Sequence, residues 1–397
     1  MSTLTATAGR GLTADQREIF ATVDAFARDT LHPLQQRMDD EEWWPPEVFP
    51  RLGEQGFLGV NVPGELGGVG ADFVTECLVV QAISRWNPAV GLSYAAHENL
   101  CLDNVVANGS DEVRRRYVPG LCDGTLVGAL GLTEPGAGSD ALGGMRTTAV
   151  RDGDDYVLNG TKLFITNGTI ADVVLTYAKT SPDAGPRGIS AFLVETATPG
   201  FRVEQKLVKM GLRGSQTAEL VFQDVRVPAA NLLGEPDRGV AVVMNGLDRE
   251  RVVIAFNALG IAERALDLSV SYAQEREQFG RPIGANQLVS GQIADMYTEL
   301  EALRSFALDV AFEVQETPHG TAAQQVATRS AALVLLAGRT LNRISDRGVQ
   351  IHGGGGYIWE TEINRLYRTA KLYEIGAGTN EVRQSIVGSN LLGIKAR

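Results

Sequence analysis

The sequence is poor in the residues that hold metals or form disulfides, with three cysteines and four histidines among 397 residues. The cysteines, Cys77, Cys101 and Cys122, have no CxxC or CxxH spacing, which argues against a structural zinc and favours a reducing compartment. We therefore expect three small buried thiols. The histidines form neither an HExxH motif nor a pair at helical spacing, so we predict no metal centre.

Long apolar runs and an excess of positive charge are also missing. No run approaches the roughly 20 residues that span a bilayer, and residues 1–11 hold one arginine and no apolar signal core. We therefore predict no membrane insertion and a cytoplasmic location. The 36 basic and 48 acidic side chains give a net charge of 36 − 48 = −12, which argues against nucleic acid as a partner.

The length predicts two to three domains. Thr13 and Gln16 have capping-box spacing before an apolar series, which predicts a helix start there. Helical patterns continue to about residue 123, strand patterns follow to about 236, and helical spacing then returns. We therefore predict an α+β protein with an N-terminal helical domain, a middle antiparallel sheet domain and a C-terminal helical bundle. The predicted boundaries are 1–125, 126–236 and 237–397.

Strand and helix signals can be located further. Asn159-Gly160 lies between two strand-like runs, and this dipeptide predicts a hairpin turn. Other predicted strands cover 171–177, 189–194 and 219–222. The long predicted helices cover 252–278, 287–316 and 322–348.

Residues 131–140 read Gly-Leu-Thr-Glu-Pro-Gly-Ala-Gly-Ser-Asp. So much glycine allows the backbone to approach a ligand closely, but the same residues also suit an ordinary turn. No GK[ST] follows, and the next predicted element is a strand, so neither a P-loop nor a Rossmann nucleotide site is indicated.

This string resembles the signature of the acyl-CoA dehydrogenase family, and the resemblance extends over nearly the whole chain. Residues 63–70 look like the family's first-domain loop, and 159–168 (Asn-Gly-Thr-Lys-Leu-Phe-Ile-Thr-Asn-Gly) resemble its flavin-facing strand. Residues 276–280 with Gln287, and 350–354, are similar to its adenine-side segments.

The resemblance implies a three-domain homotetramer that binds FAD between the sheet and the C-terminal bundle, with a neighbouring subunit completing the site. The residues that it assigns to the flavin are Leu130, Leu132, Thr133, Gly138, Ser139, Phe164, Ile165, Thr166, Arg276, Phe279, Gln287, Gln350, Ile351, His352, Gly353, Gly354, Thr379 and Asn380. Those that it assigns to the acyl-CoA are Ser139, Leu247, Asp248, Arg251, Gly376, Ala377 and Gly378.

Two of these residues have simpler interpretations. Phe164 stands where many relatives have tryptophan, and its flat ring would still pack on a flavin, but it could equally be a core strand residue. Arg276 has the fork that suits a pyrophosphate, but it also lies in a charged run typical of a solvated helix face.

The catalytic base shows a departure from the family pattern. Most relatives carry a glutamate just before a Gly-Thr pair near the C-terminus, whereas this chain has Ala377 there, and a methyl group cannot accept a proton. Members of the family that act on isovaleryl-CoA or on long chains carry their base on an earlier helix, which points to Glu250. Glu250 could also be an exposed partner of a neighbouring arginine, and Glu374 and Glu381 are weaker candidates for the base.

Removal of two hydrogens from a thioester needs a carboxylate for the α-proton and a flavin for the β-hydride. Burial should raise the pKa of Glu250 toward a useful value, and the family implies two donors to the thioester carbonyl: a ribityl hydroxyl and the backbone N–H at 377. Gly376-Ala377 replaces an aromatic residue and a glutamate of straight-chain relatives, so a branched acyl group can fit. We therefore expect a short branched acyl-CoA such as isovaleryl-CoA, in leucine breakdown or in a specialised pathway.

Two alternatives remain open. The thioester could be attached to a carrier protein, with the chain acting as a dehydrogenase or an oxidase in biosynthesis. The chain could also bind flavin without catalysis, if Glu250 pointed away from it. For a dehydrogenase, the family implies electron-transfer flavoprotein as the electron acceptor.

Overall fold

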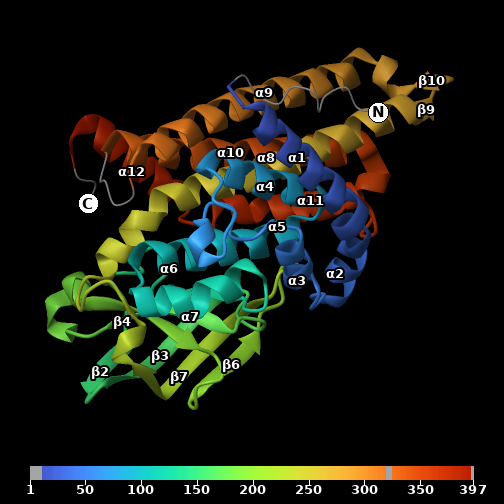
Figure 1. Ribbon diagram of the computed structural model, residues 1–397. Coiled ribbons are helices and arrows are strands. Elements are labelled where there is room, and N and C mark those ends of the chain that lie inside the picture. Colours follow the sequence, from blue (N-terminus) through green and yellow to red (C-terminus); the bar gives the residue numbers. More distant parts are fainter. Residues whose placement is uncertain (1–10, 319–323, 395–397) are drawn as a thin grey trace.

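The computed structural model describes residues 11–318 and 324–394 and has a helical layer above a twisted sheet (Figure 1). The predicted α+β class is confirmed. The N-terminal helices are α1 (Ala14–Phe26), η2 (Ala27–Leu31), η3 (His32–Leu34), α2 (Gln35–Glu41), α3 (Val48–Glu54), η4 (Gly64–Leu66), α4 (Phe73–Trp86), α5 (Pro88–Ala95), η5 (Ala96–Leu102), α6 (Asp103–Asn108) and α7 (Asp111–Cys122). The predicted capping box starts α1, because the Thr13 hydroxyl accepts from the Gln16 N–H and the Gln16 side chain accepts from the Thr13 N–H.

The sheet is mixed, so the prediction of an antiparallel sheet is wrong in part. Its strands are β1 (Gly128–Gly131), β2 (Thr148–Asp152), β3 (Asp155–Thr166), β4 (Val173–Lys179), β5 (Ile189–Glu195), β6 (Phe201–Lys206), β7 (Thr217–Pro228) and β8 (Leu232–Leu233), with short helices η6 (Pro182–Gly188) and η7 (Ala229–Asn231). Most neighbouring strands are antiparallel. However, β1 runs parallel to β4, and β2 also pairs in parallel with β4, at one pair of residues. A hairpin separates β1 from β4 along the chain, so β4 returns in the direction of β1.

The hairpin predicted at Asn159-Gly160 is wrong, because β3 runs straight through this dipeptide. The side chain of Asn159 exchanges two hydrogen bonds with Asp224, where the pairing with β7 shifts register in a bulge. A side chain at Gly160 would collide with Thr147, so glycine serves close packing here rather than a turn. The actual turn follows Asp152.

The C-terminal part is built on long helices. They are α8 (Gly239–Glu275), α9 (Gln287–Glu316), α10 (Gln324–His352), α11 (Glu362–Ala370) and α12 (Asn380–Leu392), with the short elements β9 (Glu277–Gln278), β10 (Arg281–Pro282), η8 (Ile283–Ala285), η9 (Gly353–Tyr357) and η10 (Lys371–Glu374). The prediction for α9 agrees with its bounds, whereas α8 starts 13 residues before the predicted 252. Residues 322–323 of the third predicted helix lie outside the described residues. Helix α8 begins beside the sheet and ends at the β9–β10 hairpin, at the other end of the bundle (Figure 1).

The hydrophobic cores cross the predicted domain boundaries, which stay predictions. One core joins α4 and α5 to α8, α9 and α10, with Phe256 and Leu303 among its buried residues. A second core joins α7, one face of the sheet and the start of α8, and a third lies on the other face of the sheet. Cys77, Cys101 and Cys122 are buried free thiols, as predicted. Among the described residues, no helix is both long enough and apolar enough to cross a bilayer.

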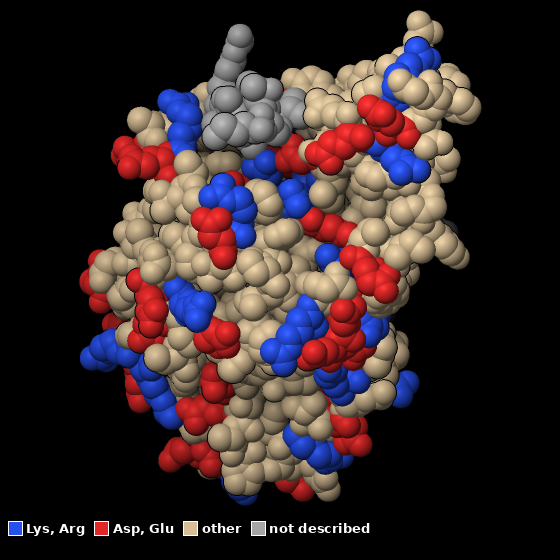
Figure 2. All heavy atoms as spheres, turned by 90° about the vertical axis from the view of Figure 1, so that its right-hand side faces the viewer, with Lys and Arg blue, Asp and Glu red and all other residues tan. Residues whose placement is uncertain are grey.

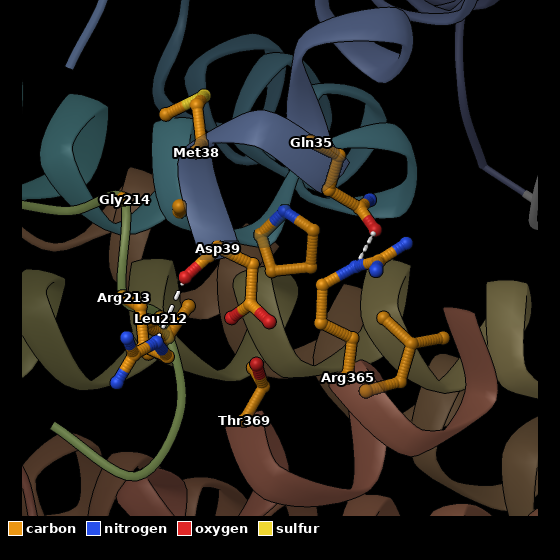
Figure 3. Close-up of a pocket in the computed structure, with 11 residues that line it drawn as sticks. Gln35, Met38, Asp39, Leu212, Arg213, Gly214, Arg365 and Thr369 are labelled. Atoms are coloured by element: carbon orange, nitrogen blue, oxygen red, sulfur yellow. Dashed lines mark hydrogen bonds between the residues drawn. The ribbon is translucent and has the colours of Figure 1, made fainter. Parts of the chain in front are cut away.

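A small pocket marks the junction where the N-terminal helices, the loop before β7 and α11 meet (Figure 3). Arg213 donates to the Asp39 carbonyl and Arg365 donates to the Gln35 side chain, both at 2.8 Å. No residue that lines this pocket belongs to the predicted site, so we interpret it as part of the seam between domains. Acidic and basic side chains are interspersed on the face shown in Figure 2.

Candidate active site

The glycine-rich loop leaves β1 and is fixed to β3 by a buried ion pair. The Lys162 ammonium donates to the Glu134 carboxylate at 2.9 Å and to the Leu132 carbonyl at 3.2 Å. Glu134 also accepts the backbone N–H groups of Arg146 and Thr147, which close the loop. Burial lowers the pKa of Lys162 to about 8 against the opposing effect of Glu134. The pair therefore fixes the backbone next to the predicted flavin contacts Leu132 and Thr133.

The end of β3 presents Phe164 outward. This residue has a φ of 62° and is 64% exposed, so the alternative interpretation as a core residue is wrong. Ile165 beside it is buried, and Thr166 is partly exposed. Asn167, also at positive φ, donates to the carbonyls of Ser93 and Gly128 and so holds the strand end against α5 and β1. An exposed aromatic ring on a strained, firmly held backbone is typical of a ligand surface.

Glu250 lies on α8 near the sheet and is partly buried. Burial raises its pKa to about 7, and the charges of Arg251 and Arg383 oppose this rise. Its two neighbours are engaged elsewhere: Arg251 donates to Asp248 at 2.9 Å, and Arg249 faces Glu76 and Asp103. The alternative interpretation as an exposed partner of those arginines therefore has no support from this geometry.

The loop of Gly376, Ala377 and Gly378, where this chain lacks the glutamate of most relatives, is contacted by Arg383, whose charge also acts on Glu250. Ala377 has a φ of 54°, and Gly378 follows at 87°. Arg383 donates to the carbonyl of Gly376 at 2.5 Å and also faces Glu250. Thr379 caps α12, and Asn380 accepts a hydrogen bond from Arg383.

The other candidates for the base have different surroundings. Glu374 pairs with Lys371 at 2.7 Å, and Glu381 is exposed in the first turn of α12.

The second core brings several predicted residues near the start of α8. Leu130 and Leu132 pack against a cluster that includes Tyr177 and Val242. The pKa of the buried Tyr177 hydroxyl is raised by burial and further by the charge of Glu250. Leu247 and Asp248 are partly exposed on the same helix.

The predicted adenine-side residues lie elsewhere, at the far end of the bundle. Arg276, Phe279, Gln287, Gln350, Gly353 and Gly354 are exposed, and Phe279 is 98% exposed. Stacking of Tyr272 on His352, with ring centroids 4.2 Å apart, joins the end of α8 to the end of α10, where Ile351 is buried. One chain therefore brings most of the predicted flavin residues together as two separate groups, one beside the sheet and one around the β9–β10 hairpin (Figure 1), whereas Thr379 and Asn380 lie at the start of α12.

Both groups have features that fit FAD. Gly136 and Gly138 of the loop, and Gly353 and Gly354 after α10, have no atom within 4 Å of the position that a side chain would take. Open backbone of this kind admits a ligand. The exposed Arg276 offers a fork for phosphates, and Phe164 offers an apolar face for a ring.

Sequence reasoning missed two parts of this arrangement. Lys162 forms a buried ion pair that the sequence prediction does not include, although a lone lysine within an apolar strand is a signal for such a pair. Arg383 carried no sequence signal, because its partners are backbone carbonyls.

The chain matches models of one protein family over most of its length. Models of the acyl-CoA dehydrogenase N-terminal, middle and C-terminal domains match residues 13–125, 129–225 and 237–392. The chain is 44% identical over 382 residues to isovaleryl-CoA dehydrogenase, mitochondrial, of Pongo abelii. This alignment covers 95% of this chain and 89% of that protein.

Two solved structures are also similar. Butyryl-CoA dehydrogenase of Megasphaera elsdenii has a TM-score of 0.92 at 36% identity, covering 97% of this chain and 100% of the other. A glutaryl-CoA dehydrogenase of Mycobacterium smegmatis, solved in complex with FADH2, has a TM-score of 0.89 at 31% identity, covering 97% and 96%. The chain belongs to the acyl-CoA dehydrogenase family, and it is therefore an FAD-dependent oxidoreductase.

Proposed function

We propose that this acyl-CoA dehydrogenase converts a short branched acyl-CoA, with isovaleryl-CoA as the first choice, to the 2-enoyl-CoA, and that Glu250 removes the α-proton. The observation that carries the proposal is the partly buried Glu250 carboxyl, with a pKa of about 7, beside an arginine that also holds the loop of Gly376 and Ala377. A general base works best when its pKa lies near the working pH. The similarity to isovaleryl-CoA dehydrogenases supports the choice of substrate.

In this proposal three residues of the chain have different roles in the reaction. The N–H of Ala377 donates to the thioester carbonyl, which acidifies the α-carbon. The Glu250 carboxylate then takes the α-proton, while Gly376 leaves room for a branch on the β-carbon. Bound FAD supplies the acceptor for the β-hydride. An acyl chain that excludes water from Glu250 raises its basicity further.

The FAD site requires a second copy of the chain in this proposal. The sheet group, with the 131–140 loop and Phe164, would hold the flavin ring, and Arg276 and Gln287 of a neighbour would hold the phosphates and the adenosine. The separation of these two groups within one chain supports a homo-oligomer, for which we propose a tetramer.

Anaerobic titration of the yellow protein with a panel of acyl-CoAs tests this proposal. We expect isovaleryl-CoA to bleach the flavin absorbance fastest, with neighbouring chain lengths also active, because one methylene changes binding by only about 1–3 kcal/mol. Glu250→Gln should retain the yellow colour and lose bleaching. Glu374→Gln is the matched control, because it neutralises a nearby carboxylate and should still bleach. Bleaching of Glu250→Gln at the wild-type rate would remove the proposed base.

A carrier-protein thioester is the second candidate for the substrate. A structure of the prolyl acyl carrier protein oxidase AnaB has a TM-score of 0.91 at 30% identity, covering 97% and 100% of the chains. Faster bleaching by a loaded carrier protein than by free acyl-CoA would favour this candidate, and peroxide release in air would indicate an oxidase. No bleaching by any thioester would leave a flavin-binding protein. For the dehydrogenase we propose electron-transfer flavoprotein as the electron acceptor and leucine breakdown as the setting.

A further inference from the structure

Arg383 is an unusual residue, because a fully charged side chain of α12 is 1% exposed. Its guanidinium donates to the carbonyls of Tyr373, at 2.7 Å, and Gly376, at 2.5 Å. A third hydrogen bond, at 3.1 Å, goes to Asn380 of its own helix. The fork therefore spans the turn that leads into Ala377.

This turn is also tied to the helix that carries Glu250. The Tyr373 hydroxyl donates to the side chain of Asn257, which lies seven residues, or about two turns, beyond Glu250 on α8. Gly338 of α10 permits the close approach, because a Cβ there would lie 2.4 Å from the Tyr373 carbonyl oxygen. Arg383 thus completes a chain of contacts from the turn to α8.

The backbone at Ala377 needs such support. Its φ of 54° is unfavourable for a non-glycine residue, and a strained conformation persists only where its surroundings impose it. Two carbonyls held by one buried guanidinium, at 373 and 376, provide that constraint on the N-terminal side of the residue.

The charges around the site come from several elements. Glu250 faces Arg251 of its own helix, Arg383 of α12 and the Tyr177 hydroxyl of β4. Arg383 in turn faces Arg251, Glu250 and two acidic side chains, Glu374 of η10 and Glu381 of α12. Arg251 is neutralised in part by its contact with Asp248, and Arg383 is the other cation whose charge acts on the carboxylate of Glu250.

We propose that Arg383 is a positioning residue for the dehydrogenation: it fixes the backbone of Gly376 and Ala377 so that the Ala377 N–H points at the thioester carbonyl, and it supplies a positive charge beside Glu250. This inference rests on the proposed function, and it makes Arg383 a residue that influences the ionisation of the base Glu250. The two roles are separable, since the fork needs a guanidinium and the charge needs only a cation.

The test compares Arg383→Met, which loses fork and charge, with Arg383→Lys, which loses only the fork. The measurement is the rate of flavin reduction by isovaleryl-CoA against pH. In Arg383→Met we expect the acid limb, set by Glu250, to move up by about 1 pH unit or more, because an opposite charge at close range favours ionisation. In Arg383→Lys the limb should stay in place, and the maximal rate should fall roughly 10–100-fold through misplacement of the N–H donor.

The matched control is Arg365→Met. Arg365 is another buried arginine, at the seam of Figure 3, so its loss should lower thermal stability without moving the acid limb. A second readout needs no substrate. The gain in stability that Glu250→Gln gives at pH 8 should be larger in the Arg383→Met background, because the ionised Glu250 has then lost its cation.

The outcomes separate the two proposals. Reduction of Glu250→Gln by isovaleryl-CoA at the wild-type rate refutes the proposed base itself. An inactive Glu250→Gln together with an unmoved acid limb in Arg383→Met refutes only the role of Arg383. If Arg383→Met does not fold, Arg383→Lys decides, because a wild-type rate and limb in that variant would show that the fork is not needed.

Discussion

Replacement of Glu250 by glutamine should make the protein more stable and less active at the same time. The folded state holds this carboxyl at a pKa of about 7, compared with an ordinary value of 4.5. Below pH 4.5 the carboxyl is protonated in both the folded and the unfolded protein, so it has no effect on their balance. As the pH rises from 4.5 to 7 the unfolded chain ionises first, and the folded state loses stability relative to it.

The magnitude follows from the two pKa values. The difference between 4.5 and about 7 corresponds to about 3 kcal/mol, and Glu250→Gln should recover up to that amount above pH 7 and little at pH 4.5. In a protein of this size the gain is a rise of a few degrees in melting temperature. The rate of flavin reduction should fall by at least about 100-fold, because a general base contributes roughly 10²–10⁴.

Melting curves of wild type and Glu250→Gln between pH 4.5 and 8.5, with bleaching by isovaleryl-CoA on the same samples, measure both effects. The neutralised control Glu374→Gln should show neither the stability gain nor the loss of reduction. Equal melting temperatures for wild type and Glu250→Gln across the whole pH range would refute the argument that burial raises this pKa.

Three other substitutions test the framework around the site. Lys162→Met leaves the buried charge of Glu134 without its cation and should destabilise the protein by about 3–5 kcal/mol. The added change Glu134→Gln removes that charge but keeps an acceptor for the N–H groups of Arg146 and Thr147, so it should restore part of the loss in denaturant unfolding. Gly338→Ala forces a methyl against the Tyr373 carbonyl and should lower the melting temperature by an amount equivalent to about 1–3 kcal/mol. Burial opposes ionisation of Glu362, but Arg264 and His32 lower its pKa to about 2. The stabilisation by this carboxylate is therefore present above pH 4.5 and is lost as the pH falls toward 2. In thermal melts at acid pH, the wild type should lose its stability advantage over Glu362→Gln.

The sequence predicted the order of helical and sheet regions because helical spacing and strand patterns are local properties. It was wrong where distant segments decide the outcome. Asn159-Gly160 has the composition of a turn, but β7 pairs with both of its flanks and β2 pairs with the flank before it, so the strand continues and the irregularity becomes a bulge. Helix α8 starts at Gly239, where helical spacing returns in the sequence, and its first turns include Gly246, where a Cβ would lie 3.1 Å from the side chain of Asn104.

For the site, the sequence offered a list of residues rather than their grouping. The absence of a carboxylate at Ala377 predicted Glu250 as the base, because the residue type at a position is known from the sequence alone. The partners that influence this carboxyl, Arg383 and Tyr177, come from α12 and β4, and no local pattern relates them to α8. Phe164 likewise is exposed at a strand end that Asn167 holds against α5, and its neighbours in sequence do not indicate this arrangement.

The largest core, which joins helices from both ends of the chain, has a consequence for synthesis on the ribosome. Helices α4 and α5 end at residues 86 and 95, which is 189 and 180 residues before the end of α8 at residue 275, and α9 and α10 follow later still. The apolar faces of α4 and α5 therefore remain exposed to solvent until the helices that cover them have been translated. Nascent chains of this protein should depend on chaperones until translation is almost finished, and truncated products that lack the last helices should aggregate.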